Sequence, residues 1–429
     1  MLFSETMRGI FSLASLLRSQ WYSEETLRKN QLVLLRNLLQ HASEKVPRYS
    51  RMMKEAGLVP QEVVSLNDLT RIPVTSKTDL QTAPSHEIVE RNTHLARCVS
   101  SRTSGATGIP LQIVTQSRDR SQFHPSFLRV YMAWGMKPWH RSASFQARPE
   151  ALDAKSWYEY LNIFPRRILN SLAEPEDWVK ELREWTPFLL LGYVLTLKLL
   201  AEYILEKGIE DLRIPLVAST SGTLDQGARQ MFKDAFGGRI CDIYASEEAG
   251  GVIAWECPVC DGYHVDIDHV VLELMDSEMK DESCEDREII VTNLCNKTMP
   301  FIRYAQGDLG QPSQANPVCG RGLPLLSAVS GRVGDFVMLP SGGRLTPHPF
   351  FLALDNALGV GQWRLTQDAS LNIHVEIVPR DDWSDLAGDE VREKIRSLVG
   401  EGPEIQIRTT GQLRKDPFQK LRSVVSEAR

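Results

Sequence analysis

The hydrophobic positions of the chain follow two periods, and each period predicts one kind of secondary structure. Between Leu27 and Val46, leucines and alanines return to one helical face; Ser23 is placed to cap the start and Pro47 to end the run. Other segments with the helical period predict helices at Glu176–Trp185, Tyr193–Lys207 and Asp225–Phe236. Short β-rich runs predict strands at Leu111–Thr115, Ile214–Ala218, Arg239–Tyr244, Val265–Leu274 and Glu288–Leu294.

The segment from Ile214 to Tyr244 predicts a βαβ unit, because a strand, a Ser/Gly turn, a helix and a strand follow in that order. We therefore expect the α/β class. Past Gly331 the elements become smaller, and the glycines Gly331 and Gly334 can act as a hinge. We place a domain boundary there, which divides the chain into residues 1–330 and a compact α+β domain of residues 331–429.

Composition narrows the function classes. The chain has 429 residues, with 49 Lys and Arg against 55 Asp and Glu, so its formal charge is −6. This balance argues against a nucleic-acid binder. The longest apolar stretch, Phe188–Leu197, is too short for a membrane span. The N-terminal stretch to Trp21 predicts a helix rather than a secretory signal. Seven cysteines, an odd number, argue against a disulfide framework and for a cytoplasmic location.

Four segments could carry phosphate chemistry. Residues 100–110 read SSRTSGATGIP, and such glycines and hydroxyls can surround a phosphate, although an ordinary polar turn would look the same. Residues 240–251 read ICDIYASEEAGG, which would place Tyr244 and the carboxylate of Glu247 at the carboxyl edge of a sheet. A carboxylate there suits Mg²⁺; a solvated acidic helix start is the alternative. The fragments MPFIRYAQGDLG and SGRVGDF supply Asp308 for ribose hydroxyls and an arginine for phosphate.

A zinc site is a further candidate. Cys257 and Cys260 are separated by two residues, His264 follows, and Cys319 comes later in VCGRGLP. Three thiols and one imidazole match a closed, structural Zn²⁺ site that would pin two loops together. Unpaired reduced thiols and a thioredoxin-like redox pair are the alternatives.

The order of these segments resembles the adenylate-forming (ANL) superfamily, in the branch of phenylacetate–coenzyme A ligases with its CapK-like and coenzyme F390 synthetase-like relatives. The fragments LLLGYVLTLKLLAEYI (Leu189–Ile204), STSGTL (Ser219–Leu224) and NLCNKTMPFIRYAQGD (Asn293–Asp308) also resemble that branch, and the likeness runs from about Leu32 to the C-terminus. It implies a large N-terminal adenylation domain of mixed β-sheets and helices, which binds nucleotide and acid, and a small mobile C-terminal domain. Zinc-bearing members of the branch have a similar arrangement of cysteines and histidine.

The resemblance also implies a role for each matching residue. Those that would contact the ATP triphosphate are Thr103, Ser104, Gly105, Thr107 and Gly108. Those that would lie along the adenine or near it are Ser221, Gly222, Tyr244, Ala245 and Ser246. Glu247 would hold Mg²⁺, Asp308 the ribose hydroxyls, and Arg332 would lie near ribose and phosphate. Asp335 would be the hinge, and Lys420 the adenylation lysine.

Departures from the family pattern leave alternatives open. Ala106 stands where relatives usually carry a hydroxyl, Ile109 replaces a lysine found in many members, and Gln419 stands where a glycine is common. Lys415 therefore competes with Lys420.

The implied activity is activation of a carboxylate by ATP, followed by transfer of the acyl group to coenzyme A. The acceptor could instead be an amine, an amino acid or a carrier-protein thiol, and a non-catalytic nucleotide-binding relative is the third option. Nine tryptophans and the segment with Phe123, His124, Trp134 and Trp139 favour an aromatic acid without requiring one. His140 and Arg141 are weak candidates to hold a carboxylate or a coenzyme phosphate. A homodimer is compatible with all of these options.

Overall fold

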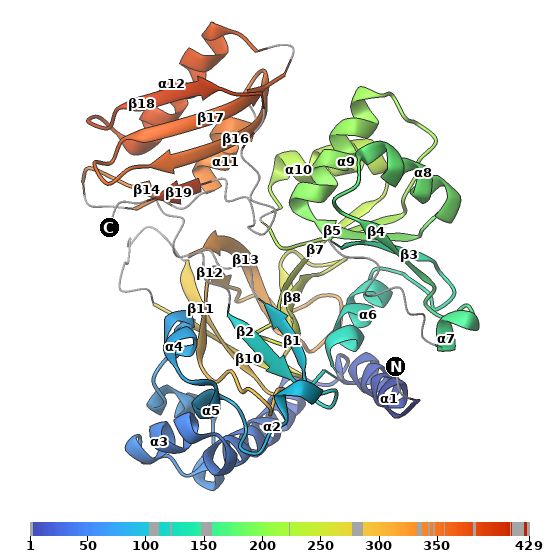
Figure 1. Cartoon of the computed structure of the whole chain (residues 1–429), viewed down its shortest axis with the longest axis vertical. Coiled ribbons are helices and arrows are strands. Elements are labelled where there is room, and N and C mark those ends of the chain that lie inside the picture. Colours follow the sequence, from blue (N-terminus) through green and yellow to red (C-terminus); the bar gives the residue numbers. More distant parts are fainter. Residues whose placement is uncertain are drawn as a thin grey trace.

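The computed structural model of the chain (Figure 1) describes residues 3–102, 111–120, 122–146, 157–222, 224–276, 286–332, 337–341, 344–345, 348–355, 357–380, 383–411, 413 and 424–426. Helices and strands alternate along most of it, which confirms the expected α/β class. A large lower part carries the N-terminus, and a smaller sheet with two helices lies above it (Figure 1).

The helices of the large part are α1 (Phe3–Ser19), α2 (Glu24–Lys45), α3 (Pro47–Glu55), α4 (Lys77–Thr82), α5 (Ser85–Ile88), α6 (Phe123–Ala133), α7 (Trp157–Tyr160), α8 (Pro175–Trp185), α9 (Val194–Glu206) and α10 (Gln226–Phe236), with short 3-10 turns at Pro60–Glu62, Leu66–Arg71 and Leu95–Arg97. The predicted cap is confirmed, since the Ser23 hydroxyl accepts a hydrogen bond from the Thr26 N–H at the start of α2. The predicted face of α2 is buried, with Leu35, Leu38 and Leu39 fully covered. None of the helices in the described part of the chain has the length and apolar character needed to cross a membrane.

An eleven-stranded sheet forms the centre of this part, in the order β10-β11-β12-β13-β9-β8-β7-β6-β5-β3-β4. Its strands are β3 (Ser142–Gln146), β4 (Arg166–Asn170), β5 (Leu189–Tyr193), β6 (Leu216–Thr220), β7 (Arg239–Ser246), β8 (Gly251–Glu256), β9 (Tyr263–Val265), β10 (Val270–Met275), β11 (Arg287–Asn293), β12 (Tyr304–Pro312) and β13 (Leu325–Arg332). The neighbours from β4 to β7 pair in parallel, and those from β7 to β10 pair antiparallel. The predicted βαβ unit is confirmed as β6, α10 and β7.

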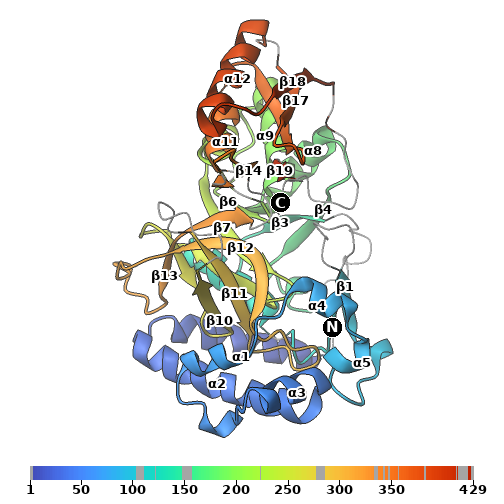
Figure 2. The same ribbon diagram turned by 90° about the vertical axis from the view of Figure 1, so that its left-hand side faces the viewer.

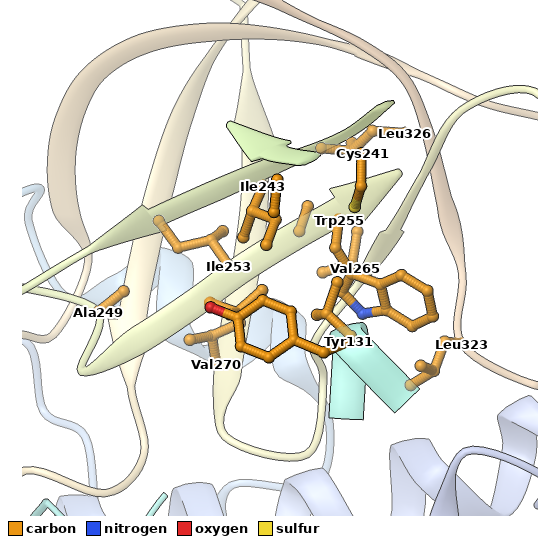
Figure 3. Close-up of a cluster of buried hydrophobic side chains, with 14 of the residues drawn as sticks. Tyr131, Cys241, Ile243, Ala249, Ile253, Trp255, Val265, Val270, Leu323 and Leu326 are labelled. Carbon is orange, nitrogen blue, oxygen red and sulfur yellow. The ribbon is translucent and has the colours of Figure 1, made fainter. Parts of the chain in front are cut away.

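Two hydrophobic clusters cover opposite faces of the parallel half. On one face, α8, α9 and α10 contribute Trp178, Leu197 and Phe232 to a cluster with strands β3 to β7. On the other face, α6 contributes Tyr131, which packs in the cluster that contains Trp255 (Figure 3). Helices α2 and α3 pack beneath the β10 end of the sheet (Figure 2). The parallel strands are thus covered on both faces, and their carboxyl edge is left to form a site.

The single strand predicted over Val265–Leu274 is wrong. The chain forms β9, turns at residues 266–269 and starts β10, which pairs with β11 at the far edge of the sheet. The turn is held by the fully buried Arg129, whose guanidinium pairs with Asp266 and lies 2.5 Å from Asp268. Periodicity alone missed this turn because its polar side chains are buried with a distant partner.

The hairpin of β1 (Val99–Arg102) and β2 (Gln112–Thr115) stands apart from the large sheet, with Arg102 opposite Gln112. The C-terminal part comprises β14 (Val337–Met338), β15 (Arg344–Leu345), α11 (His348–Asp355), β16 (Val360–Gln367), β17 (Ile373–Pro379), α12 (Asp385–Val399), β18 (Ile405–Thr409) and β19 (Val424–Ser426). It has its own sheet, in the order β18-β17-β16-β19, and its own apolar cluster. The boundary at residue 331 stays a prediction; β13, the last strand of the large sheet along the chain, ends at Arg332.

Candidate nucleotide site and candidate metal centre

The carboxyl edge of β6 and β7 brings together two of the segments singled out in the sequence. Because these strands are parallel and Thr220 lies opposite Ile243, residues 221–222, which follow β6, lie beside the last residues of β7, 244–246, and Glu247 comes directly after them. Ser221 has a φ of 55° and Gly222 a φ of 154°. A Cβ on Gly222 would also lie 3.2 Å from Cβ of Val194, so a side chain there would be strained as well as crowded.

Asp308 reaches this edge from the antiparallel half of the sheet. The Tyr244 hydroxyl donates a hydrogen bond to Oδ2 of Asp308 at 2.8 Å, although the two residues are 64 positions apart. Gly307 precedes Asp308 with a φ of 72°, a left-handed conformation that glycine adopts without strain. Asp308 lies opposite Arg332 in the β12–β13 ladder, which brings the backbone of Arg332 to the same place.

Glu247 has a partner that the sequence did not reveal. Nη1 of Arg120 lies 3.5 Å from Oε2 of Glu247, and the guanidinium also stacks over the Phe123 ring at 4.7 Å. The Ser246 hydroxyl accepts a hydrogen bond from the Ala249 N–H at 3.0 Å, which closes the turn that follows β7. No local pattern marked Arg120, since it precedes α6 and is distant from β7 in the sequence.

Arg303, in the fragment MPFIRYAQGDLG, is held inside the protein. Its guanidinium lies 2.9 Å from Glu273 and donates a hydrogen bond of 2.6 Å to the Ile72 carbonyl. The side chain is 4% exposed. Arg303 therefore supports the start of β12, and its guanidinium is bound to protein groups rather than placed to contact a phosphate.

Several predicted site residues lie outside the described residues: Thr103, Ser104, Gly105, Thr107, Gly108, Asp335, Lys415 and Lys420. For Arg332 the structure describes the backbone but not the side chain. The loop 103–110 joins the ends of β1 and β2.

The weaker candidates for an acid or coenzyme site are scattered. Trp134 is buried and donates a hydrogen bond to the Glu256 carbonyl, whereas Trp139 is 64% exposed. His140 stacks on Phe188 with ring centroids 4.1 Å apart, just before the amino end of β3, which is the edge opposite to the candidate nucleotide site. Phe123, by contrast, lies beside Gly251 at the turn after β7.

The predicted metal ligands come together. The Sγ atoms of Cys257, Cys260 and Cys319 lie within 4.8 Å of one another, and Nε2 of His264 is 3.3 Å from Sγ of Cys319. Zn–S bonds of about 2.3 Å at tetrahedral angles separate two sulfurs by about 3.8 Å, so the cluster needs little adjustment to accept the ion. The Cys260 N–H also donates to Sγ of Cys257 at 3.3 Å.

His264 is oriented as a metal ligand would be. Its Nδ1 lies 3.0 Å from the Leu323 carbonyl oxygen, which directs Nε2 toward the cysteines. Burial lowers the pKa of His264 to about 4, so the imidazole is neutral at pH 7. Burial opposes ionisation of Cys319, but hydrogen bonds from Arg321 outweigh it and hold the pKa of this thiol below its usual value. The donor set thus fits a zinc ion.

The loop that carries Cys319 also holds the N-terminal helices. Nε of Arg321 donates to Oε1 of Gln20 at 3.0 Å, and the Gly322 N–H donates to the Gln20 carbonyl at 2.9 Å. The Arg321 guanidinium lies over the rings of Trp21 and Trp255. A Cβ on Gly322 would lie 1.8 Å from the Tyr22 carbonyl oxygen, so this close approach requires glycine.

A comparison with protein-family models finds no match. Among curated proteins, a phenylacetate-coenzyme A ligase of Pseudomonas putida is 24% identical over 424 residues, which is 92% of this chain and 92% of the relative. One from Thermus thermophilus is 27% identical over 330 residues, which is 73% of this chain and 72% of the relative. The protein CapK of Staphylococcus aureus is 23% identical over 313 residues, covering 70% of this chain and 66% of CapK.

Solved structures show the same fold. A 2-hydroxyisobutyryl-CoA ligase in the postadenylation state matches with a TM-score of 0.76 at 19% identity, over 96% of this chain and 91% of that one. The same ligase in the thioesterification state, in complex with an acyl-AMP and CoA, gives 0.62 at 20% identity, over 96% and 92%. In sequence the chain is thus similar to phenylacetate-coenzyme A ligases and to CapK, and it has the fold of the 2-hydroxyisobutyryl-CoA ligase.

Proposed function

We propose that the chain is an ATP-dependent, AMP-forming acid–thiol ligase, which converts a carboxylic acid to an acyl-adenylate and transfers the acyl group to coenzyme A. The observation that carries this proposal is the hydrogen bond between Tyr244 and Asp308 at the carboxyl edge of the sheet. It joins two distant motifs at the place where open α/β sheets bind ligands. The full-length relatives named as phenylacetate-coenzyme A ligases support the same activity.

In this proposal the nucleotide lies along the edge formed by β6 and β7. Ser221, Gly222, Tyr244, Ala245 and Ser246 would line the adenine. The Asp308 carboxylate would accept hydrogen bonds from the ribose hydroxyls, with Tyr244 holding one of its oxygens in place. Arg332, opposite Asp308 in the ladder, would lie near ribose and phosphate.

The reaction has two steps. A carboxylate oxygen of the acid attacks the α-phosphorus of ATP; the new P–O bond gives the acyl-adenylate, and the bond to pyrophosphate breaks. The thiol of coenzyme A then attacks the acyl carbon, and AMP leaves. Thr103, Ser104, Gly105, Thr107 and Gly108 would hold the triphosphate, and the Lys420 ammonium would stabilise charge on the α-phosphate oxygens, with Lys415 as its competitor.

Glu247 is the proposed Mg²⁺ ligand. Carboxylate oxygen is a ligand that Mg²⁺ accepts, and the bound ion would neutralise charge on the phosphates. The Glu247 side chain is about one-third exposed, so an ion can reach it from solvent, and its contact with Arg120 is a single one at 3.5 Å. Arg120 would have to share Glu247 with the ion or move toward the phosphates.

We further propose that Cys257, Cys260, His264 and Cys319 hold a structural Zn²⁺. The fit of the four ligand atoms supports it, and all four positions are then filled by protein. Metal analysis of chelator-washed protein is expected to give about one zinc per chain, and Cys257→Ser to lose it while Cys98→Ser retains it. A stoichiometry near zero in a folded protein would exclude the site.

The proposal also covers the domain arrangement, the acid, the location and the oligomeric state. We place the hinge at Asp335 and the domain boundary at residue 331, because the sheets of the two parts share no strand. An aromatic acid is the favoured substrate. The six described cysteines are free thiols, which supports a cytoplasmic location. A homodimer stays a prediction that size measurement in solution will check.

The test is ATP–pyrophosphate exchange against a panel of aromatic and aliphatic acids, with Mg²⁺ present. Exchange that depends on one acid class supports adenylation and identifies the substrate. AMP release that requires coenzyme A supports the thiol acceptor, whereas release driven by amines or a carrier protein favours the alternative acceptor. A folded protein that binds ATP and exchanges with no acid would instead be a non-catalytic relative.

A further inference from the structure

A cleft lies away from the candidate nucleotide site. It has a volume of about 860 Å³ and is bordered by α1, the end of α2, the segment after α5 and the segment between β2 and α6. Helices α1, α2 and α5 lie in the lower part of the molecule in both views (Figures 1 and 2). Its lining residues are mostly polar or charged: Arg8, Glu44, Lys45, Glu90, Arg91, Asn92, Thr93, His94, Arg97, Cys98, Gln116, Ser117 and Arg118.

The charge of this cleft is opposite to that of the whole chain. Five arginine and lysine side chains line it, against two glutamates, in a protein whose formal charge is −6. Positive charges gathered in a hollow with low-dielectric walls raise the local potential and attract small anions.

The base of the cleft is built around Glu90. This carboxylate is 9% exposed, and Arg118 and Lys45 lie 2.5 and 3.4 Å from it. Its backbone N–H donates to the Thr298 carbonyl at 2.8 Å, which ties the base to the main body of the protein. Glu90 therefore draws two cations to the base of the cleft, although Arg118 also lies 3.5 Å from Asp119 and is shared between the two carboxylates.

The rim supplies cations that protein carboxylates do not neutralise. Within the described residues, Arg8, Arg91 and Arg97 make no ion pair, and the buried Thr93 hydroxyl has no hydrogen-bond partner. One guanidinium group can donate two parallel hydrogen bonds to two oxygens of a phosphate, and a hydroxyl can donate one more. These donors suit a phosphate better than a single carboxylate, because a phosphate offers more acceptor oxygens.

The cleft is separate from the proposed triphosphate loop. Cys98 and Gln116 flank one end of the β1–β2 hairpin and border the cleft, whereas loop 103–110 joins the other end. The four residues of β1 span about 13 Å at about 3.3 Å per residue. A ligand in the cleft is thus linked to the loop through one short hairpin.

We propose that this basic cleft binds the phosphate groups of a small, multiply charged phosphate compound, with Arg91 and Arg97 as its principal contacts. The chemistry is shared by polyphosphate chains and by the phosphates of coenzyme A. The polyphosphate form of this proposal is independent of the proposed ligase activity, whereas the coenzyme A form rests on it.

The test is calorimetric titration of the full chain with inorganic tripolyphosphate, coenzyme A and dephospho-coenzyme A. The cleft variant is Arg91→Gln/Arg97→Gln. The control is Arg28→Gln/Arg183→Gln, which changes the charge equally at exposed arginines paired with Glu24 and Asp211. Melting temperatures without ligand verify that both variants fold.

We expect the cleft variant to bind tripolyphosphate or coenzyme A at least about tenfold more weakly than wild type, with the control within about twofold. If coenzyme A binds wild type more tightly than dephospho-coenzyme A does, and this difference disappears in the cleft variant, the 3′-phosphate of coenzyme A is the bound group. If tripolyphosphate binds wild type as tightly as coenzyme A does, the cleft recognises a polyphosphate chain. Equal affinities of the cleft and control variants, or no binding to wild type at millimolar ligand, would overturn the proposal. ATP–pyrophosphate exchange is expected to persist in the cleft variant, which separates this result from the proposed function.

Discussion

Replacing Asp308 by alanine removes the group that we assign to the ribose hydroxyls. Each hydroxyl would donate to an ionised acceptor, and one hydrogen bond to a charged group contributes about 1.5–3 kcal/mol. We therefore expect kcat/KM for ATP to fall by about 10- to 150-fold for each lost bond. The carboxylate is partly exposed at the edge of β12, so the substitution leaves the apolar clusters untouched.

Tyr244→Phe tests whether the tyrosine acts through Asp308. It removes the 2.8 Å hydrogen bond and keeps the ring. Because this hydroxyl acts on ATP only by holding the carboxylate in place, we expect a smaller decrease than for Asp308→Ala, of about 2- to 10-fold. If the hydroxyl serves only to hold the carboxylate, the double variant will be no worse than Asp308→Ala, since a positioning group contributes nothing once its partner is absent.

The assay is ATP–pyrophosphate exchange over a range of ATP concentrations, with KM and kcat separated. Tyr263→Phe is the matched control, because the Tyr263 hydroxyl also donates to an aspartate, Asp242, at 2.9 Å, but farther back along β7. We expect this control to lower the melting temperature and to leave KM for ATP unchanged. An unchanged KM for ATP in Asp308→Ala, or equal effects of the two tyrosine variants, would refute the assignment.

Three further predictions concern separate parts of the chain. Lys420→Ala should reduce acid-dependent pyrophosphate release by at least about a hundredfold, because one charged donor contributes about 3 kcal/mol to the barrier, with the fold intact by circular dichroism. Gly322→Ala should cost about 1–3 kcal/mol in urea unfolding, because its Cβ would overlap the Tyr22 carbonyl oxygen. Burial raises the pKa of the Asp242 carboxyl to about 6 in the folded protein. Below pH 4 the protonated carboxyl therefore stabilises the folded state by about 3 kcal/mol, and this stabilisation is lost as the pH rises through 6.

Each of these has a contrasting measurement. Lys415→Ala should retain exchange, and the reverse outcome would assign the chemistry to Lys415. Gly9→Ala, which meets no atom within 4 Å in α1, should be neutral or stabilising, and an equal loss in both glycine variants would remove the steric argument. Asp242→Asn should be free of the pH-dependent change between pH 4 and 6, and parallel pH profiles of the two proteins would contradict the raised pKa.

The local elements could be predicted to a large extent from the sequence. The helix after Ser23, the βαβ unit and the helices α8, α9 and α10 follow from periodicity and capping, because those signals depend on neighbours a few residues away. The turn at residues 266–269 was not predicted. The buried Arg129, on α6, decides where the strand breaks, and no pattern within the segment contains it.

For the candidate site, the sequence supplied the residue types and their order. It indicated a tyrosine and two acids near one edge, and four metal ligands with two in a short spacing. It could not predict that Arg120 contacts Glu247, that Arg303 is used inside the protein, or that the Cys319 loop holds the N-terminal helices. Those partners are distant in sequence and are ordinary residues in their own segments.

The chain alone therefore determined which short segments form helices and strands, and which of them carry groups suited to phosphate, ribose and zinc. Only the tertiary structure decided which groups meet. A hydrogen bond such as that of Tyr244 with Asp308 requires two strands from different halves of one sheet to come close to each other. Strand order is set by burial of the whole sheet between its helices, a property of the folded chain that no local spacing contains.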